Sequence, residues 1–317
     1  MPKAVQLSAY GGIDQLKLVD VPKPEPKAGE VVVRVVAAGT NPGEISIREG
    51  RLKDIFPMDF PFGQGADFSG CIDSAGAGVA EFAAGDEVLG WSEERSAQAE
   101  YVVSSPSRLI SKPPALDWFR AGSLFVVAST AVGAVRAVAL GPGDVVAISN
   151  AAGGVGSLAV QLARRTGARV IGIASDASEK FLRSVGVEHV AYGDGLAERL
   201  RALAPTGIDA FLDLFGGGYV ELALALGVAP ERIDTIIDFA AGEKHGVKTD
   251  GSSAADSPET IAFVANLIAW GEIVMPLAAL YPLAQVKDAY TELARRKAHG
   301  KIVLAVDAPV SQPLHPL

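Results

Sequence analysis

The sequence has little cysteine and little histidine, and both scarcities limit the chemistry that it can support. Cys71 is the one cysteine among 317 residues, which excludes an internal disulfide and a four-cysteine zinc site. The four histidines are scattered, and no two have the i, i+4 spacing of a helical metal site. They are His189, His245, His299 and His315. We therefore expect no metal site.

The sequence also lacks an excess of basic residues and an apolar run in residues 1–6. The net charge of −9 disfavours a general nucleic-acid surface or an anionic membrane as partner. Residues 1–6 do not form the apolar run of a signal peptide, so we expect a cytoplasmic protein. The apolar stretch of residues 121–140, interrupted by Arg136, is interpreted as a buried helix and not as a membrane span, because a βαβ pattern follows it directly.

What the sequence does contain is typical of a compact α/β enzyme of two domains. Hydrophobic residues make up 49% of the chain, charged residues 21%, and there are 35 glycines. A chain of this length has room for a substantial core in each domain.

Residues 145–192 contain the most informative pattern. A short apolar run, Val145–Ile148, is followed by the glycine turn Ala151-Ala152-Gly153-Gly154-Val155-Gly156, a helical pattern ending at Gly167, and a second apolar run, Arg169–Ile173. The spacing is not the usual G-x-G-x-x-G, but strand, glycine turn, helix and strand together predict a βαβ unit that binds a dinucleotide. The glycines would let the backbone approach a pyrophosphate, which the free N–H groups at the helix start would hold.

The two parts of the chain differ in their periodicity. Residues 1–116 contain short strands separated by Gly-rich turns, which predicts an antiparallel, barrel-like domain. Helices and strands alternate over residues 117–272, which predicts a doubly wound parallel sheet. Strands are expected there at residues 208–215 and 232–239, among others. Residues 273–317 return to strand-like pieces, and we assign them to the first domain because no helix follows the run at 301–306.

Motifs along nearly the whole chain resemble those of a known family. In chain order they are Val21-Pro22-x-Pro24-x-Pro26, Gly29-Glu30-Val31, Ala38-Gly39-Thr40-Asn41-Pro42, Asp67-Phe68-Ser69-Gly70, Gly85-Asp86-Glu87-Val88, Thr130-Ala131, Ala151-Ala152-Gly153-Gly154-Val155-Gly156 and Gly300-Lys301-Ile302-Val303-Leu304. The chain resembles the zinc-independent medium-chain dehydrogenase/reductases, specifically their quinone oxidoreductase branch. The resemblance implies a GroES-like β-barrel substrate domain made from both chain ends, a Rossmann domain, and a homodimer.

The resemblance also bears on metal binding. Zinc-dependent alcohol dehydrogenases of the same superfamily hold a catalytic zinc with a Cys, a His and a second Cys. Local motif alignment places Asn41, Ala66 and Val126 at those positions, and none of the three is a zinc ligand. Without a Lewis acid a bare alcohol is hard to oxidise, whereas a quinone or an α,β-unsaturated carbonyl delocalises the charge that hydride brings.

Family matches place two polar side chains, Asn41 and Thr130, beside the nicotinamide and the substrate carbonyl. Each can donate a hydrogen bond to a developing oxyanion, although Asn41 before Pro42 is also a natural turn former. Glu44 could relay a proton, but a solvated acid at a helix start is the favoured interpretation. Residues 48–52 lack the tyrosine proton donor of enoyl-reducing relatives, so we expect the proton to come from solvent.

The end of the second strand bears on the choice of cofactor. An acidic residue there would favour NAD, but the sequence has Ala174 followed by Ser175. A hydroxyl with Lys180 (or Arg183) nearby would accept a 2′-phosphate, although Asp176 opposes this, and Ser175 and Lys180 could simply begin the next helix. Tyr192 matches a family residue beside the adenosine ribose. We predict NADPH rather than NADH.

The expected cofactor-binding residues also include the glycine turn and the ends of two strands. Phe215 and Phe239 are expected to end the fourth and fifth strands, at the sheet edge where a ligand binds, although Phe215 could equally pack in the core. The full set is Ala152, Gly153, Gly154, Val155, Gly156, Ser175, Lys180, Tyr192, Phe215, Phe239 and Ala240. Loops 54–62 and 243–257 are expected to shape the acceptor pocket.

These features predict an NADPH-dependent reductase of quinones or enones that uses no zinc. Two alternatives remain open. One is a biosynthetic enoyl reductase, and the other is a cofactor-binding protein without physiological turnover, acting as a structural or RNA-associated protein. The basic run at residues 295–297 is better explained as the solvated end of the last helix than as an RNA site.

Overall fold

The structure is a computed structural model that describes residues 1–307, and the chain forms two compact units. Unit 1 contains Met1–Val126, Ile261–Trp270 and the described residues from Leu277 onward. Unit 2 contains Val127–Thr260 and Gly271–Pro276. The domain boundaries expected from the sequence, 1–116 with 273–317 and 117–272, stay a prediction, and His315 lies outside the described residues.

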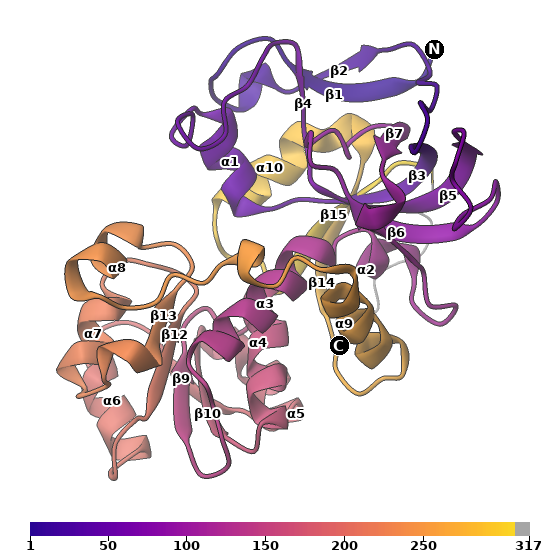
Figure 1. Cartoon of the computed structure of the whole chain (residues 1–317). Helices are drawn as coiled ribbons and strands as arrows, with labels where there is room; N and C mark the ends of the chain where they lie inside the picture. The colour runs from indigo at the N-terminus through magenta and orange to yellow at the C-terminus, as the bar shows by residue number, and fades with distance from the viewer. Residues whose placement is uncertain (308–317) are drawn as a thin grey trace. The chain divides into compact units, whose positions relative to one another are not determined.

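Unit 1 is built mainly from strands. Its seven-stranded sheet has the order β14-β15-β3-β5-β6-β8, with β7 pairing beside β3 (Figure 1). These strands are β3 (Val31–Gly39), β5 (Asp67–Ala75), β6 (Glu87–Trp91), β7 (Tyr101–Ser104), β8 (Leu109–Ser111), β14 (Leu277–Pro282) and β15 (Lys301–Ala305). A three-stranded sheet of order β2-β1-β4 joins β1 (Lys3–Leu7), β2 (Lys17–Asp20) and β4 (Phe62–Gly63).

The last described strand, β15, lies beside a strand from the first part of the chain. β15 pairs antiparallel with β3, with Val303 opposite Gly39. β14 and β15, however, run parallel, which the expectation of an antiparallel domain missed. The reason is the crossover between them, which carries helix α10 (Val286–Ala294).

The core of unit 1 explains why its helices lie where they do. Apolar side chains from β1, β15, α1 (Pro42–Arg48) and α10 form one cluster, in which Tyr290 and Leu7 are fully buried. A second cluster lies among β3, β5, β6 and β7 around Phe68. Helix α2 (Trp118–Ala121) begins at Asp117, whose carboxylate caps it by accepting from the Phe119 and Arg120 backbone N–H groups.

Unit 2 is a doubly wound parallel sheet, as predicted. The strand order is β11-β10-β9-β12-β13, which reverses direction at β9, where the glycine turn begins. The strands are β9 (Val145–Ile148), β10 (Arg169–Ala174), β11 (Glu188–Ala191), β12 (Ala210–Asp213) and β13 (Ile233–Thr235). The helices are α3 (Phe125–Ala137), which starts in unit 1, α4 (Gly154–Arg165), α5 (Glu179–Ser184), α6 (Leu196–Leu203), α7 (Tyr219–Ala225) and α8 (Phe239–His245). Helix α9 (Pro258–Ala269) begins in unit 2, but most of its residues belong to unit 1.

The helices cover both faces of this sheet. Side chains of α6, α7 and α8 pack on one face in a cluster around Phe211 and Ile233. Figure 1 shows α4 and α5 on the opposite side of the strands. Short 3₁₀ helices also occur at Ile13–Gln15, Pro106–Arg108, Asp176–Ser178, Pro230–Arg232, Ser252–Ala254 and Leu283–Gln285.

Two strands end earlier in the chain than the sequence predicts. β12 ends at Asp213, two residues before Phe215, and β13 ends at Thr235, so Phe239 does not end a strand. Phe239 is instead the first residue of α8, because the Asp238 side chain caps the helix by accepting from Ala241 N at 3.1 Å. The strand predicted at residues 232–239 is thus divided between a short strand and a helix start.

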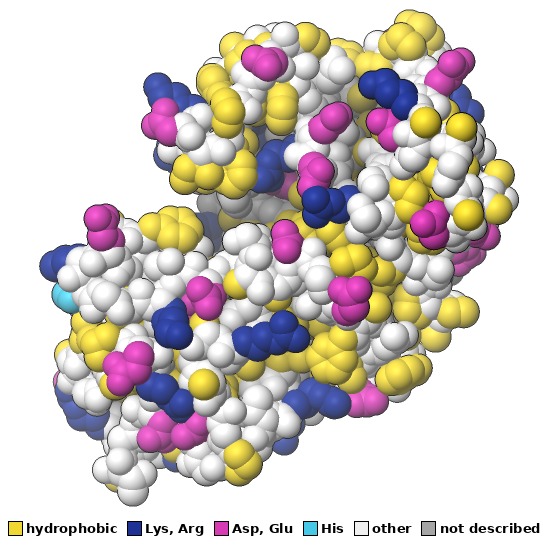
Figure 2. Space-filling model, in the orientation of Figure 1, with side chains coloured by type: hydrophobic (Ala, Val, Ile, Leu, Met, Phe, Trp, Pro, Cys, Tyr) yellow, Lys and Arg dark blue, Asp and Glu magenta, His cyan; other side chains and the backbone are white. Residues whose placement is uncertain are grey.

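The long apolar stretch forms α3, which is shorter than the run of residues 121–140, and most of its side chains are buried. Across residues 1–307, no helix has the length and hydrophobicity required to cross a membrane. On the face shown in Figure 2, acidic and basic side chains are interspersed.

Asp234 on β13 is a buried carboxyl whose hydrogen bonding is incomplete. Its Oδ1 accepts from Asp250 N at 2.7 Å, while Oδ2 has no hydrogen-bond partner within residues 1–307. Burial raises the pKa of Asp234 to about 7, and the nearby Asp250 and Asp213 carboxylates act in the same direction.

This carboxyl should make stability fall as pH rises. The folded pKa lies above the value of about 3.9 in an unfolded chain, so the folded state binds more protons between about pH 4 and 7, and the free energy of unfolding decreases across that window. We expect Asp234→Asn to raise the free energy of unfolding by about 1–3 kcal/mol near pH 8 and by almost nothing near pH 4. Urea denaturation at both pH values measures this, and an equal gain at both would contradict it.

Candidate active site

The glycine turn of unit 2 has the close backbone packing expected of a dinucleotide site. A Cβ atom on Gly156 would lie 2.0 Å from the Asn150 carbonyl oxygen, and one on Gly153 would lie 2.6 Å from Asn150 Nδ2. Ala152 is buried in the turn. The first intrahelical hydrogen bond of α4 runs from Ser157 N to the Gly153 carbonyl at 2.9 Å. The N–H groups of Gly154, Val155 and Gly156 therefore precede the helical ladder, where they can bind an anion.

A fully buried carboxylate, Asp213, organises the loops around this turn. Its Oδ1 accepts from Ser149 Oγ at 3.0 Å and from Phe215 N and Gly216 N, while Oδ2 accepts from Thr235 Oγ1 at 2.9 Å. Ser149, Asp213 and Thr235 lie at the ends of three adjacent strands, β9, β12 and β13. One side chain thus fixes three loops at the carboxyl edge of the sheet, and the sequence analysis missed it.

Two of the expected adenosine-side residues lie together. The Tyr192 N–H donates to the Ala174 carbonyl at 3.3 Å, so Tyr192 is next to Ser175 at the ends of β11 and β10. Tyr192 is 59% exposed and Lys180 on α5 is exposed, whereas Arg183 is held in an ion pair with Glu179 at 2.7 Å. Lys180 is therefore the better placed of the two cations for a ligand phosphate.

The remaining expected residues of unit 2 are spread along its sheet edge. Phe215 is half-buried, with its ring centroid 6.3 Å from that of Tyr219. Phe239 and Ala240 are exposed at the start of α8. Thr130 is buried within α3 in unit 2, and Asn41 lies in unit 1.

Unit 1 contains a buried polar network centred on Asn41 at the junction of β3 and α1. Lys301 Nζ on β15 donates to Asn41 Oδ1 at 2.7 Å and to the Thr40 carbonyl at 2.8 Å. Asn41 Nδ2 donates to Asp67 Oδ2 at 3.0 Å and to Glu44 Oε1 at 3.3 Å. Both the oxygen and the nitrogen of the Asn41 amide are therefore hydrogen-bonded. The nitrogen would have to release one of its hydrogen bonds to donate to a substrate oxygen.

Glu44 is a central acceptor in this network, and the expectation that it is a solvated acid is wrong. It is 4% exposed, because α1 packs against α10. Besides the Asn41 amide, its carboxylate accepts from Asn41 N, from Ala66 N and from Tyr290 OH, the last at 2.5 Å. Burial raises the pKa of Glu44, while the Tyr290 hydrogen bond lowers it.

The network contains one ammonium, that of Lys301, and two carboxylates, those of Asp67 and Glu44. Burial lowers the pKa of the Lys301 ammonium, and the Asp67 and Glu44 carboxylates oppose that shift. Burial and the Glu44 charge raise the pKa of Tyr290 well above its usual range. Gln64 Nε2 and Gln98 Nε2 both donate to Tyr290 OH at 2.8 Å, which directs its proton toward Glu44.

The three positions aligned with zinc ligands converge at this network, but their atoms do not suit zinc. Asp67 Oδ1 accepts from Val126 N at 3.0 Å, and Glu44 bonds both Asn41 and Ala66. The Ala66 and Val126 side chains have no ligand atom, and the Asn41 oxygen is bound by the Lys301 ammonium. Among the described residues, no group of three His, Cys, Asp or Glu side chains could hold a metal ion.

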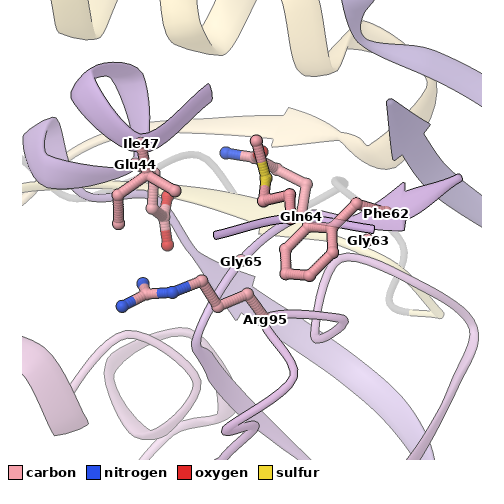
Figure 3. Close-up of a pocket in the computed structure, with 8 residues that line it drawn as sticks. Glu44, Ile47, Phe62, Gly63, Gln64, Gly65 and Arg95 are labelled. Carbon is pink, nitrogen blue, oxygen red and sulfur yellow. The ribbon is translucent and has the colours of Figure 1, made fainter. Parts of the chain in front are cut away.

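The expected pocket loop lines a cavity beside this network. A cavity of about 570 Å³ in unit 1 is bordered by segment 55–63 and by residues 93–96. The second loop, residues 243–257, belongs to unit 2 and does not line this cavity. A smaller space of about 10 Å³ lies deeper, between Glu44, Gln64 and Arg95 (Figure 3).

Two protein families match the chain, one in each unit. The family described as "Alcohol dehydrogenase GroES-like domain" matches residues 27–114, and "Zinc-binding dehydrogenase" matches residues 154–227. The second name mentions zinc, but residues 154–227 include none of the three aligned positions and only one histidine, His189.

Three relatives have related names. The quinone oxidoreductase of Pseudomonas aeruginosa is 29% identical over 96% of this chain and 99% of its own length. The chloroplastic NADPH-dependent alkenal/one oxidoreductase of Arabidopsis thaliana is 28% identical over 95% and 79%. The chloroplastic quinone-oxidoreductase homolog of Spinacia oleracea is 33% identical, but the match covers 59% of this chain and 60% of that protein.

Solved structures agree in fold. The quinone oxidoreductase of Coxiella burnetii is 30% identical, with a TM-score of 0.86 over 96% of this chain and 99% of that chain. A mycobacterial protein complexed with NADPH is 25% identical, with a TM-score of 0.82 over 96% and 100%. The CurK enoyl reductase is 26% identical, with a TM-score of 0.82 over 96% and 99%.

Fold, site and relatives together define a dinucleotide-dependent oxidoreductase with a GroES-like domain and a Rossmann domain. The chain belongs to the medium-chain dehydrogenase/reductase family and is quinone oxidoreductase-like. It therefore uses a nicotinamide cofactor and a small-molecule substrate.

The buried ammonium of Lys301 should be essential for the stability of unit 1. Lys301→Met leaves Asp67 and Glu44 without their cation, and we expect a loss of about 3–5 kcal/mol in the free energy of unfolding. Adding Asp67→Asn to this variant should restore part of the loss. Lys287→Met, at a half-exposed lysine on α10, serves as the matched control and should change stability by less than about 0.5 kcal/mol. Equal denaturation midpoints for the two single variants would contradict this role.

Proposed function

We propose that this protein is an NADPH-dependent oxidoreductase that transfers a hydride to a quinone or another α,β-unsaturated carbonyl without zinc. The observation that carries the proposal is the set of side chains at the three zinc-ligand positions. Two are aliphatic, and the third, Asn41, is bound to the Lys301 ammonium. Such a site suits acceptors that delocalise negative charge themselves, which quinones and enones do.

The cofactor fits the residues of unit 2. The N–H groups of Gly154, Val155 and Gly156 would hold the pyrophosphate, and the turn has no room for a Cβ at Gly156. Ser175 and Lys180 would hold a 2′-phosphate, with Tyr192 beside the ribose. The NADPH complex of the mycobacterial neighbour and the name of the Arabidopsis relative support this choice.

The reduced nicotinamide supplies the hydride when bound. Of this chain's residues, Asn41 and Thr130 are proposed to orient the acceptor, and the proton is proposed to come from solvent. For Asn41, the hydrogen bonds to Asp67 and Glu44 make rigid positioning the better supported contribution. A homodimer and a cytoplasmic location complete the proposal.

A biosynthetic enoyl reductase is the second candidate, favoured by the similarity to the CurK enoyl reductase. A screen that follows NADPH oxidation with quinones, simple enones and enoyl thioesters separates the two. We expect turnover with quinones or enones to exceed that with thioesters. The reverse order would favour the second candidate, and tight NADPH binding without turnover of any acceptor would favour a protein that only binds the cofactor.

The choice between NADPH and NADH can be tested on α5. We expect Lys180→Ala to raise the KM for NADPH by about tenfold and to leave the KM for NADH unchanged, because NADH has no 2′-phosphate. Arg183→Ala is the matched control, since this exposed cation on the same helix is already paired with Glu179. Ser175→Asp should reverse the preference toward NADH. A similar KM change for both cofactors in Lys180→Ala would contradict the assignment.

A further inference from the structure

The cavity of unit 1 has an apolar wall and large exposed apolar side chains at its border. Seven of its lining residues are apolar, namely Ile47, Ile55, Phe56, Pro57, Met58, Pro61 and Phe62. Ile55 is 69% exposed, and Phe56 and Phe60 are each more than a third exposed. Its volume of about 570 Å³ is in the range of small-molecule sites. Side chains of this kind are better covered by an apolar ligand than by water.

Among the described residues that line this cavity, Arg95 alone is a cation, and it also lines the smaller space beside Glu44. Its guanidinium carbon lies 4.4 Å above the Phe56 ring, and within residues 1–307 the group forms no ion pair and donates no hydrogen bond. Figure 3 shows the guanidinium extending toward the Glu44 carboxylate. Burial lowers the pKa of Arg95, while the Glu44 and Asp67 charges oppose the shift and keep it protonated. Up to five N–H donors are thus available to an acceptor oxygen.

The backbone helps to hold Arg95 in this place. Its φ angle is +53°, a left-handed conformation that is uncommon for a residue other than glycine. Arg95 N donates to the Ser92 carbonyl, and the next residue, Ser96, donates its N–H to Ser92 Oγ at 3.1 Å. These contacts fix the turn from which the side chain extends.

The other charges of the lining are acidic. Asp59, Glu93 and Glu94 border the cavity, and Glu93 is paired with Arg108. A ligand with its own carboxylate or phosphate would meet Asp59 and Glu94 on entry. The lining therefore suits a neutral apolar molecule with one oxygen that accepts a hydrogen bond.

We propose that this cavity binds a neutral apolar carbonyl acceptor and that Arg95 donates a hydrogen bond to the carbonyl oxygen on which negative charge develops. The inference rests on the proposed function and assigns the electrophilic role to Arg95. In the reduction of an enone, a C–H bond of the reduced nicotinamide breaks, and its two electrons form a C–H bond at the β-carbon of the acceptor. The π electrons move to the carbonyl oxygen, which gives an enolate that takes a proton from water. In the reduction of a quinone, the hydride instead forms an O–H bond at one carbonyl oxygen, and the π electrons move to the other oxygen beside Arg95, which gives a quinol anion that also takes a proton from water. The nicotinamide is oxidised as the acceptor is reduced, and the guanidinium stays protonated throughout.

The test replaces Arg95 and follows both binding and turnover. Arg95→Gln should lower kcat with a neutral naphthoquinone by about 100-fold, because a donor to the oxyanion is lost. The dissociation constant for NADPH should stay unchanged. Arg51→Gln is the matched control, since Arg51 is an exposed arginine of unit 1 that pairs with Glu49 and does not line the cavity. It should keep full turnover.

Chemical rescue distinguishes a role at the acceptor from a structural one. Added guanidinium ion at millimolar concentration should restore part of the turnover of Arg95→Ala and none of that lost in an unrelated defective variant such as Lys301→Met. Wild-type turnover in Arg95→Gln, or absence of rescue in Arg95→Ala with an unchanged fold, would overturn the proposal while leaving the proposed function intact.

A binding measurement keeps the inference testable even if no acceptor is reduced. Equilibrium dialysis measures the affinity for a redox-inert aryl ketone, and we expect the wild type to bind this ketone several-fold more tightly than the Arg95→Gln variant does. We also expect the wild type to bind the corresponding aryl carboxylate more weakly than it binds the ketone. Equal ketone affinities for the two proteins, or tighter binding of the carboxylate, would contradict the proposal. Failure of every acceptor to oxidise NADPH would instead refute the proposed function.

Discussion

The ammonium of Lys301, buried among two carboxylates and an amide, is the interaction on which unit 1 depends. It connects β15, at the end of the described chain, to the junction of β3 and α1 through hydrogen bonds to the Thr40 carbonyl and to Asn41 Oδ1. The Asn41 side-chain amide in turn donates hydrogen bonds to Asp67 and Glu44. A buried cation of this kind is costly to desolvate unless its partners are placed accurately. The hydrogen bonds of Lys301 thus join a late strand of the described chain to an early one within unit 1.

In unit 2 a single buried carboxylate, that of Asp213, holds the loops around the glycine turn. Asp213 fixes the loops after β9, β12 and β13, so that the glycine turn is held by contacts from neighbouring strands and not by its own sequence alone. In both units a buried charge holds the backbone around a proposed ligand site. The proposed hydride transfer without a Lewis acid would require rigid positioning of this kind, because orientation would then contribute a larger part of the rate enhancement.

Local patterns in the sequence predicted much of the fold. The βαβ unit and the alternation of helices and strands depend on residues close in the chain, and the structure confirms the parallel sheet. An error occurred where a helix cap competed with a predicted strand. Phe239 follows the apolar pair Ile236 and Ile237, but the Asp238 side chain caps a helix there. Glu44 looked like an ordinary acid at a helix start, and only the packing of α10, more than 200 residues later in the chain, buries it.

The site was predicted less completely than the fold, for the same reason. Arg95 lies in the acidic turn Glu93-Glu94-Arg95, and nothing in those letters indicates that the guanidinium faces Glu44 across a cavity. Asp213 ends an otherwise apolar strand, and such a sequence predicts only a buried strand. The cluster of Phe56, Met58 and Phe62 in loop 54–62 was a signal for the pocket wall, and that loop does line the cavity.

The central claim is that hydride reaches a carbonyl acceptor with no metal taking part. The most direct measurement is NADPH oxidation with a neutral quinone after exhaustive treatment with a chelator, followed by addition of zinc. The account predicts the same turnover before chelation, after it and with zinc restored. Activity that disappears on chelation and returns with zinc would contradict it.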